Sequence, residues 1–171
     1  LPLHVADAFR AVLLDEHIDP ALAAQILTLP SENEIAELFD TIDPEAISAV
    51  HTAITRCLAS EMADEFSAVY HAHRLPSYRV EHADIARRSL RNVCLRYLAF
   101  TDAGESDKRV ITQFEQADNM TDSLAAMSAA VAANLPCRDT LLAAFDQRWH
   151  QDGLVMDKWF MLQATSPAAD V

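Results

Sequence analysis

The segment DPEAISAVHTAITRCLASEMADEFSAVYHAH (residues 43–73) decides the fold class of this chain. Asp43 is a residue type that caps helices, and Pro44 suits the first helical position because the N–H that it lacks would have no partner there. Apolar side chains then recur every three or four residues, which is the spacing of one buried helix face. The segment therefore predicts a single amphipathic helix of about seven turns. Its apolar stripe consists of Ile47, Val50, Ile54, Leu58, Met62, Phe66 and Val69.

Three further helices are predicted before this segment. Residues 5–13 carry apolar side chains with helical spacing, and Asp19 with Pro20 forms another Asp-Pro helix start. Ser31 and Glu34 have the spacing of a capping box, in which the two side chains satisfy each other's backbone N–H groups. Short helices in close succession are therefore expected here.

Five more helices are predicted after the segment. The first covers residues 81–100 and is rich in arginine. Ser106 and Thr121 are expected to cap the next two, and Pro136 is expected to start the fourth. The last helix covers residues 154–165 and is followed by a proline.

The sparse glycine supports an all-α fold. The chain has only 2 glycines; Gly104 is expected in a flexible loop and Gly153 just beyond the end of a helix. Eight or nine helices joined by short connections should lie antiparallel as consecutive pairs. Stacked pairs predict a superhelical array like armadillo or HEAT repeats, with a closed helical bundle as the structural alternative. At this length, residues 1–171 are expected to form a single domain.

The net charge of −13 limits the classes of partner. Nucleic acids and anionic membrane surfaces carry the same sign of charge, so neither is an expected partner. No apolar run is long enough to cross a bilayer, and the first residues lack the features of a signal peptide. We therefore expect a soluble, cytoplasmic monomer.

The sequence contains no recognisable catalytic or metal-binding pattern. Cys57, Cys94 and Cys137 are widely separated, which is typical of reduced thiols in a helical core. His71 and His73 are two residues apart and point about 200° apart around a helix, so they cannot chelate one ion. No H-E-x-x-H motif is present. The sequence thus assigns no catalytic or metal-binding residue, and it does not identify a substrate-binding residue.

Two charged clusters are the remaining candidates for function. Glu61, Asp64 and Glu65 share one helix face, where carboxylates either perform acid–base chemistry or form a solvated, ion-paired surface. The second cluster, rich in arginine, is expected to dock on these acids, although it could instead bind an anion or a carboxylate. This second cluster comprises Arg74, Arg79, Arg87, Arg88, Arg91 and Arg96.

Several long stretches resemble one protein family. The most distinctive are LRNVCLRYL (residues 90–98), NMTDSLAA (residues 119–126) and DKWFMLQA (residues 157–164). They are similar to the C-terminal helical domain of bacterial aminopeptidase N, an alanyl aminopeptidase of the zinc-dependent gluzincin class. The resemblance extends over essentially all 171 residues. It implies that this chain is an incomplete part of a larger multidomain enzyme.

The resemblance also implies that catalysis and control of substrate access lie in different domains. In that family the zinc-binding H-E-x-x-H segment and the G-x-M-E-N stretch that holds the substrate's amino group lie in a thermolysin-like catalytic domain. The helical domain would enclose the active-site chamber and restrict access to short peptides, while the enzyme removes N-terminal amino acids. This chain alone should be inactive and should contain no zinc. The alternative is a standalone helical scaffold that binds a peptide or a protein.

The last predicted helix has few polar positions. Trp159 and Phe160 are adjacent, and only a narrow strip formed by Asp157, Lys158 and Thr165 is polar. We expect the preceding helix to cover one side and further helices of the same array to cover another. Trp159 or Phe160 should therefore lie on a partly open face.

Overall fold

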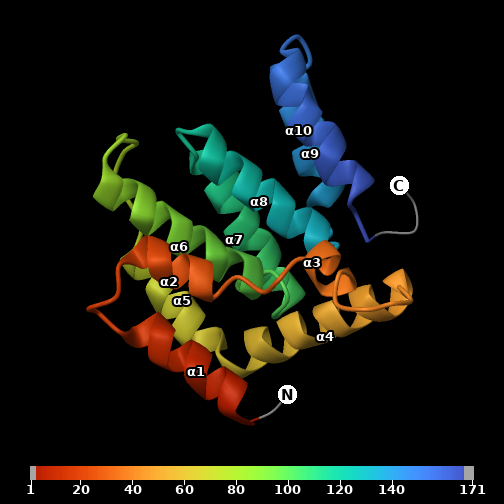
Figure 1. Ribbon diagram of the computed structural model, residues 1–171. Coiled ribbons are helices and arrows are strands. Elements are labelled where there is room, and N and C mark those ends of the chain that lie inside the picture. Colours follow the sequence, from red (N-terminus) through yellow and green to blue (C-terminus); the bar gives the residue numbers. More distant parts are fainter. Residues whose placement is uncertain (1–2, 168–171) are drawn as a thin grey trace. The chain divides into compact units, whose positions relative to one another are not determined.

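The computed structural model describes residues 3–167, and every helix or strand assigned within that range is an α-helix (Figure 1). The predicted all-α class is confirmed. None of the described helices is long and apolar enough to span a membrane. The ten described helices are α1 Leu3–Leu14, α2 Pro20–Ile26, α3 Glu32–Ala36, α4 Pro44–Glu61, α5 Ala63–Ala72, α6 His82–Leu98, α7 Ala103–Gln116, α8 Met120–Ala132, α9 Arg138–Trp149 and α10 Gly153–Ala164.

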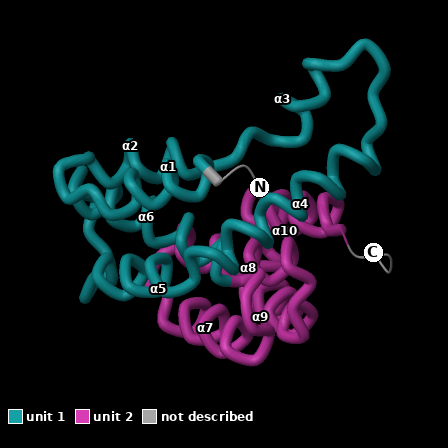
Figure 2. The backbone as a smooth tube through the Cα atoms, turned by 90° about the horizontal axis from the view of Figure 1, so that it is seen from below, with its two compact units in different colours: residues 1–98 teal, residues 99–171 magenta. Residues whose placement is uncertain are grey.

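The chain divides into two compact units, residues 1–98 and residues 99–171 (Figure 2). In the first unit, α6 packs against α2, α4 and α5, α1 packs against α2 and α5, and α3 packs against α4. In the second unit, α8 packs against α7, α9 and α10, and α9 packs against α10. The expectation of one domain over residues 1–171 stays a prediction.

Aromatic rings form the centre of the first unit. Tyr97 of α6 stacks on Phe66 of α5 with ring centroids 4.5 Å apart, and Phe9 of α1 meets the same tyrosine edge-on at 6.3 Å. The Tyr97 hydroxyl donates a 2.7 Å hydrogen bond to the backbone carbonyl of Leu27, just after α2. One buried side chain therefore joins α1, α2 and α5 to α6.

The single long helix predicted for the segment 43–73 is wrong, because the chain is divided there into two helices at Met62. This residue has φ −126° and ψ 23°, outside the helical region, and its side chain is fully buried. The Met62 N–H still donates to the Leu58 carbonyl, and its own carbonyl accepts from the Phe66 N–H. The chain can therefore change direction here while both of these helical hydrogen bonds are kept. This division accounts for ten helices where at most nine were expected.

The helix starts in the first unit are confirmed. The Asp19 side chain accepts from two N–H groups at the start of α2, and the Asp43 side chain accepts from the Ala46 N–H in α4. Ser31 and Glu34 form the predicted capping box, and these hydrogen bonds lower the pKa of the Glu34 carboxyl. Capping depends on contacts over three residues, so the sequence alone identified it.

Two helix starts in the second unit were predicted too late. Asp102, not Ser106, caps α7, and Ser106 is a fully buried residue inside that helix. The predicted loop at Gly104 is accordingly the first turn of α7. Asn119, not Thr121, caps α8. In both cases an earlier residue with a suitable side chain is the cap, four positions earlier for α7 and two positions earlier for α8.

The ends of α8 and α9 also differ from the predictions. Asn134 adopts the left-handed conformation with φ 50°, and the next N–H, of Leu135, donates to the Ala130 carbonyl as in a Schellman motif. Pro136 lies in a turn just before α9, which begins at Arg138. Gly153 is the first residue of α10 rather than the residue that ends α9. The one left-handed helix end in the described range therefore uses asparagine, not glycine.

Candidate functional site

The acidic cluster at the junction of α4 and α5 is held to α1 by Arg10. Arg10 of α1 donates from Nε to the Glu65 carboxylate at 2.7 Å and from Nη2 to the Glu61 backbone carbonyl at 3.3 Å. The hydrogen bond from Arg10 lowers the pKa of the Glu65 carboxyl. A carboxylate held in its charged form is poorly suited to donate a proton. The ion-paired interpretation of this cluster is thus confirmed for Glu65.

The arginine-rich helix docks on the helix before it, as predicted, but the predicted pairing of its arginines with these acids is wrong. Among the described residues, the ion-pair partner of Glu65 is Arg10, which lies on α1 and not on α6. The α6 arginines do contact the preceding helix, but through uncharged groups. Arg87 donates to the carbonyl of Ala72 at the end of α5, where the helix dipole favours a cation.

Arg91 makes the second contact between α6 and α5. Its guanidinium donates to the Tyr70 hydroxyl at 2.9 Å and lies over the Tyr70 ring at 4.5 Å from the centroid. Tyr70 is buried, so this pair combines a hydrogen bond with a cation–π contact at a sheltered position. The arginines of α6 therefore hold two helices together.

The segment before α6 is folded onto that helix by two other arginines. Arg79 donates to both carboxylate oxygens of Asp84, at 2.7 and 3.2 Å, and the Asp84 side chain is buried. Arg88, which is also buried, donates to the Arg79 carbonyl and lies 4.8 Å from the centroid of the Tyr78 ring. These contacts give this part of the cluster a structural role.

The histidines and cysteines of the described residues do not form a metal site. Over residues 3–167, no three His, Cys, Asp or Glu side chains are grouped so that they could hold a metal ion. His73 contacts the Val69 carbonyl through Nδ1, and His71 packs against the Tyr70 ring. Burial raises the pKa of the Cys94 thiol to about 12, and burial together with a hydrogen bond to Asp107 raises that of Cys137 to about 12.

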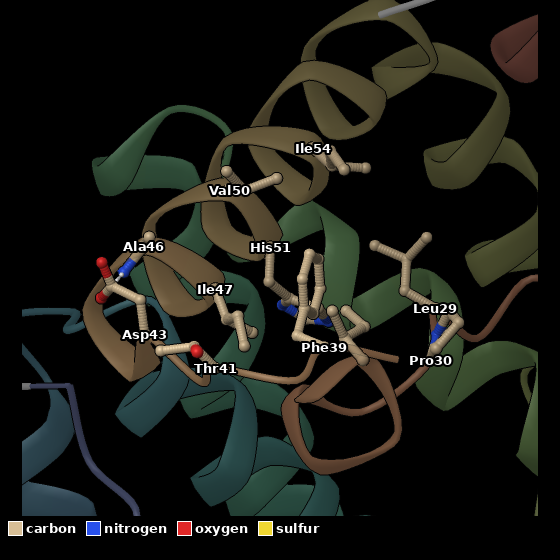
Figure 3. A pocket seen from close by; sticks show the side chains of 11 residues that line it. Leu29, Pro30, Phe39, Thr41, Asp43, Ala46, Ile47, Val50, His51 and Ile54 are labelled. Atoms are coloured by element: carbon tan, nitrogen blue, oxygen red, sulfur yellow. Dashed lines mark hydrogen bonds between the residues drawn. The ribbon is translucent and has the colours of Figure 1, made fainter. Parts of the chain in front are cut away.

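A pocket between α3 and α4 was not predicted from the sequence. Its volume is about 260 Å³, and its lining is almost entirely apolar (Figure 3). We call it the α3–α4 groove. Part of the predicted apolar stripe, at Ile47, Val50 and Ile54, lines it instead of entering the core. The other lining residues are Leu29, Pro30, Ile35, Phe39, Thr41, Asp43, Ala46 and His51.

The sequence contained one signal for this groove. The apolar stripe continues through residues 47–69, but only its second half, from Leu58 onward, is buried. Val50 remains 58% exposed, and Phe39, on the segment after α3, remains 56% exposed. An amphipathic helix whose face is longer than the core that it covers leaves such a surface open.

The last helix leaves part of its apolar surface uncovered, as predicted. Trp159 is half-buried and donates from Nε1 to the Leu142 carbonyl of α9 at 2.9 Å. Phe160 packs edge-on against the Trp159 ring at 5.1 Å and is 59% exposed. The prediction that one of these two rings lies on a partly open face is confirmed.

Known proteins similar to this chain are aminopeptidases. Aminopeptidase N of Escherichia coli (strain K12) is 68% identical over 171 residues, which are 100% of this chain and 20% of that protein. Aminopeptidase N of Haemophilus influenzae is 49% identical over 167 residues, covering 98% of this chain and 19% of that protein. The chain thus spans about a fifth of the length of these relatives.

The fold also matches a solved structure. The crystal structure of Legionella pneumophila aminopeptidase A in complex with aspartic acid superposes with a TM-score of 0.84 at 25% identity. The match covers 98% of this chain and 21% of that one. Together with the sequence identities above, this match confirms the resemblance to aminopeptidase N that the sequence indicated.

A family model gives the class of the repeats. The model described as a domain of unknown function, DUF3458_C, with ARM repeats matches residues 1–171. The predicted armadillo-like class agrees with this description and with the exclusively helical elements of residues 3–167. The chain belongs to the DUF3458_C family of ARM-repeat domains.

Proposed function

We propose that this chain is the non-catalytic, C-terminal helical part of a zinc-dependent aminopeptidase that removes N-terminal amino acids from peptides. The observation that carries the proposal is the sequence identity with aminopeptidase N, which extends over all 171 residues of the chain. The partner of these helices is then the remainder of the same polypeptide, including a thermolysin-like catalytic domain.

In this proposal the helices shape access to the active site. They enclose the chamber in which peptides are cleaved and restrict entry to short peptides. The described residues offer no cluster of ligands that fits zinc, so no step of the hydrolysis is assigned to them. When bound elsewhere in the enzyme, zinc would supply an activated water as the nucleophile. The contribution of this chain is rigidity, through contacts such as Arg10 with Glu65.

The proposal includes the cellular setting. The enzyme is a cytoplasmic monomer whose substrates are peptides, with neither nucleic acid nor membrane as a partner. The net charge of −13 supports the exclusion of polyanionic partners, because like charges repel.

A segment exchange tests the proposal. The matching segment of Escherichia coli aminopeptidase N would be replaced by this chain, and hydrolysis of an aminoacyl-arylamide would be measured with zinc present. We expect the chimera to retain most of the activity, whereas this chain alone should be inactive. Turnover by the chain alone, or stoichiometric zinc retained after dialysis, would refute the division of labour. An inactive but folded chimera would count against the assignment to this enzyme.

A standalone scaffold that binds a peptide or a protein is the second candidate. The exposed α3–α4 groove favours it, because an exposed apolar surface can mark a site of interaction with another chain. Size-exclusion chromatography separates the candidates. A clean monomer would favour the self-sufficient scaffold, whereas self-association would favour a segment that normally packs against more of its own enzyme.

A further inference from the structure

The α3–α4 groove combines an apolar interior with an apolar rim. Its volume of about 260 Å³ lies below the roughly 300–1,000 Å³ of pockets for small molecules, so it suits a single bulky side chain. Two of its lining residues, Phe39 and Val50, are more than half exposed. These side chains offer contact area around an inserted side chain without any need to unfold the protein.

The part of the chain that contains the groove carries many acidic residues and no lysine or arginine. Residues 11–55 contain nine aspartates and glutamates and neither lysine nor arginine. Two of these acids, Glu34 and Asp43, are used in helix caps. Four others are exposed and form no ion pair with any described residue: Glu32, Glu37, Asp40 and Glu45. Unpaired carboxylates around an apolar pocket attract a partner of positive charge.

We propose that the α3–α4 groove binds a short basic peptide segment from outside these 171 residues. One leucine or phenylalanine side chain of the segment enters the pocket between Phe39, Ile47 and Ile54 (Figure 3). Lysine or arginine residues on either side of this anchor lie near the exposed carboxylates of α3 and the start of α4. Apolar burial supplies most of the affinity, and the charges select basic over neutral segments. This inference does not depend on the proposed enzymatic role.

The charge distribution argues against other occupants. A second copy of this chain also carries a net charge of −13, so pairing two acidic surfaces would be opposed by repulsion. An anionic membrane would be repelled for the same reason. Arg79, Arg87 and Arg88 already make contacts within their own part of the fold, so these three are poor candidates for an internal partner.

Titration of the 171-residue chain with three peptides tests the proposal. The probe is an N-acetylated, C-amidated heptapeptide with a central phenylalanine flanked on each side by alanine, arginine and lysine. One matched peptide has serine in place of the phenylalanine, and the other has glutamine in place of every basic residue. Binding is followed by isothermal titration calorimetry and by amide NMR shifts. We expect the probe to bind with shifts confined to residues 29–54, and each matched peptide to bind at least tenfold more weakly.

Substitutions in the groove provide a second test of the proposal. Phe39→Ala should weaken binding roughly tenfold, because it removes a wall of the pocket. Glu37→Gln with Asp40→Asn should weaken it roughly three- to tenfold, an effect that salt reduces. The matched controls are Leu154→Ala and Glu115→Gln, which change exposed residues of the other unit and should leave binding unchanged. Circular dichroism would show that each variant remains folded, since Phe39 is exposed.

Several results would overturn the proposal. Equal binding of the serine peptide would mean non-specific electrostatic attraction, and equal binding of the glutamine peptide would mean that the carboxylates play no part. Shifts outside residues 29–54 would place the peptide elsewhere. A dimer seen by sedimentation, lost in Phe39→Ala but kept in Leu154→Ala, would assign the groove to a second copy of the chain instead.

Discussion

Replacing Tyr97 by phenylalanine should lower the free energy of unfolding by about 1–2 kcal/mol. The Tyr97 ring is 3% exposed and Leu27 is fully buried, so the 2.7 Å hydrogen bond between the hydroxyl and the Leu27 carbonyl is shielded from water. No other described residue donates to that carbonyl. An unpaired buried acceptor costs roughly 1–3 kcal/mol, partly offset because the variant has no hydroxyl to desolvate.

The substitution isolates this one interaction. Phenylalanine keeps the ring, so the stack on Phe66 and the edge contact with Phe9 remain. Urea unfolding followed by far-UV circular dichroism measures the change, and an unaltered m-value would show that the same surface is exposed on unfolding. In a thermal melt we expect a decrease of about 3–6 °C. Tyr78→Phe makes the same chemical change on a ring that is 46% exposed, and it should cost less than about 0.5 kcal/mol.

Alkaline pH provides an independent check. Burial raises the pKa of Tyr97 to about 12, whereas the unfolded chain has the ordinary value of about 10. Because the pKa of Tyr97 is higher in the folded chain, the protonated hydroxyl contributes fully to stability below pH 10. This contribution is lost as the pH rises through 12. At pH 10.5 the loss through this group is about 1 kcal/mol, and the phenylalanine variant has no such loss. The two proteins should therefore approach each other in stability above pH 10.

The reasoning would be refuted by a variant as stable as the parent chain at neutral pH. It would also be refuted by a difference in stability that stays constant between pH 8 and pH 10.5. The first result would mean that the hydroxyl contributes nothing net, and the second that Tyr97 titrates alike in the folded and unfolded chains.

Substitutions at three other positions test further contacts. Arg10→Gln should slightly lower the free energy of unfolding measured in urea, mainly through the ion pair with Glu65. Because the pKa of Glu65 is lowered in the folded chain, this effect should shrink progressively as the pH falls below about 4.5. An effect that does not shrink with decreasing pH would contradict this. Arg91→Gln should lower the free energy of unfolding by about 1 kcal/mol or less in the same assay, since it removes the contacts with Tyr70. A larger decrease would indicate that more of the packing between α5 and α6 depends on Arg91. Asp102→Ala should lower the free energy of unfolding by about 1 kcal/mol because it removes the cap of α7. Asp102→Asn keeps a capping oxygen and should lower it much less. Equal decreases would contradict the capping role of Asp102.

The helices could be predicted because their signals act over a few residues. The Asp-Pro starts at residues 19 and 43 and the capping box at Ser31 each need only the next three residues to form. The predictions failed where two capping residues lay close together, as at Asp102 and Ser106. There the choice depends on the rest of the fold, because Ser106 is fully buried in the packed unit.

The candidate sites could be predicted only in part. The acidic residues were recognised as ion-pair candidates, yet Arg10, the partner of Glu65, lies 55 residues earlier in the chain and belongs to a different helix. The α3–α4 groove was missed because a continuous apolar stripe predicts burial along its whole length. The structure buries only the half that other helices cover.

The sequence by itself determined that this chain is helical, where most of its helices begin, and which family it resembles. Periodicity, capping and residue identity are local properties, and they are present before any packing occurs. Only the tertiary structure decided that the long helix breaks at Met62, that Arg10 rather than an α6 arginine pairs with Glu65, and that part of the apolar stripe stays open. These outcomes depend on which surfaces meet, and residues far apart in the chain compete for those surfaces only once it has folded.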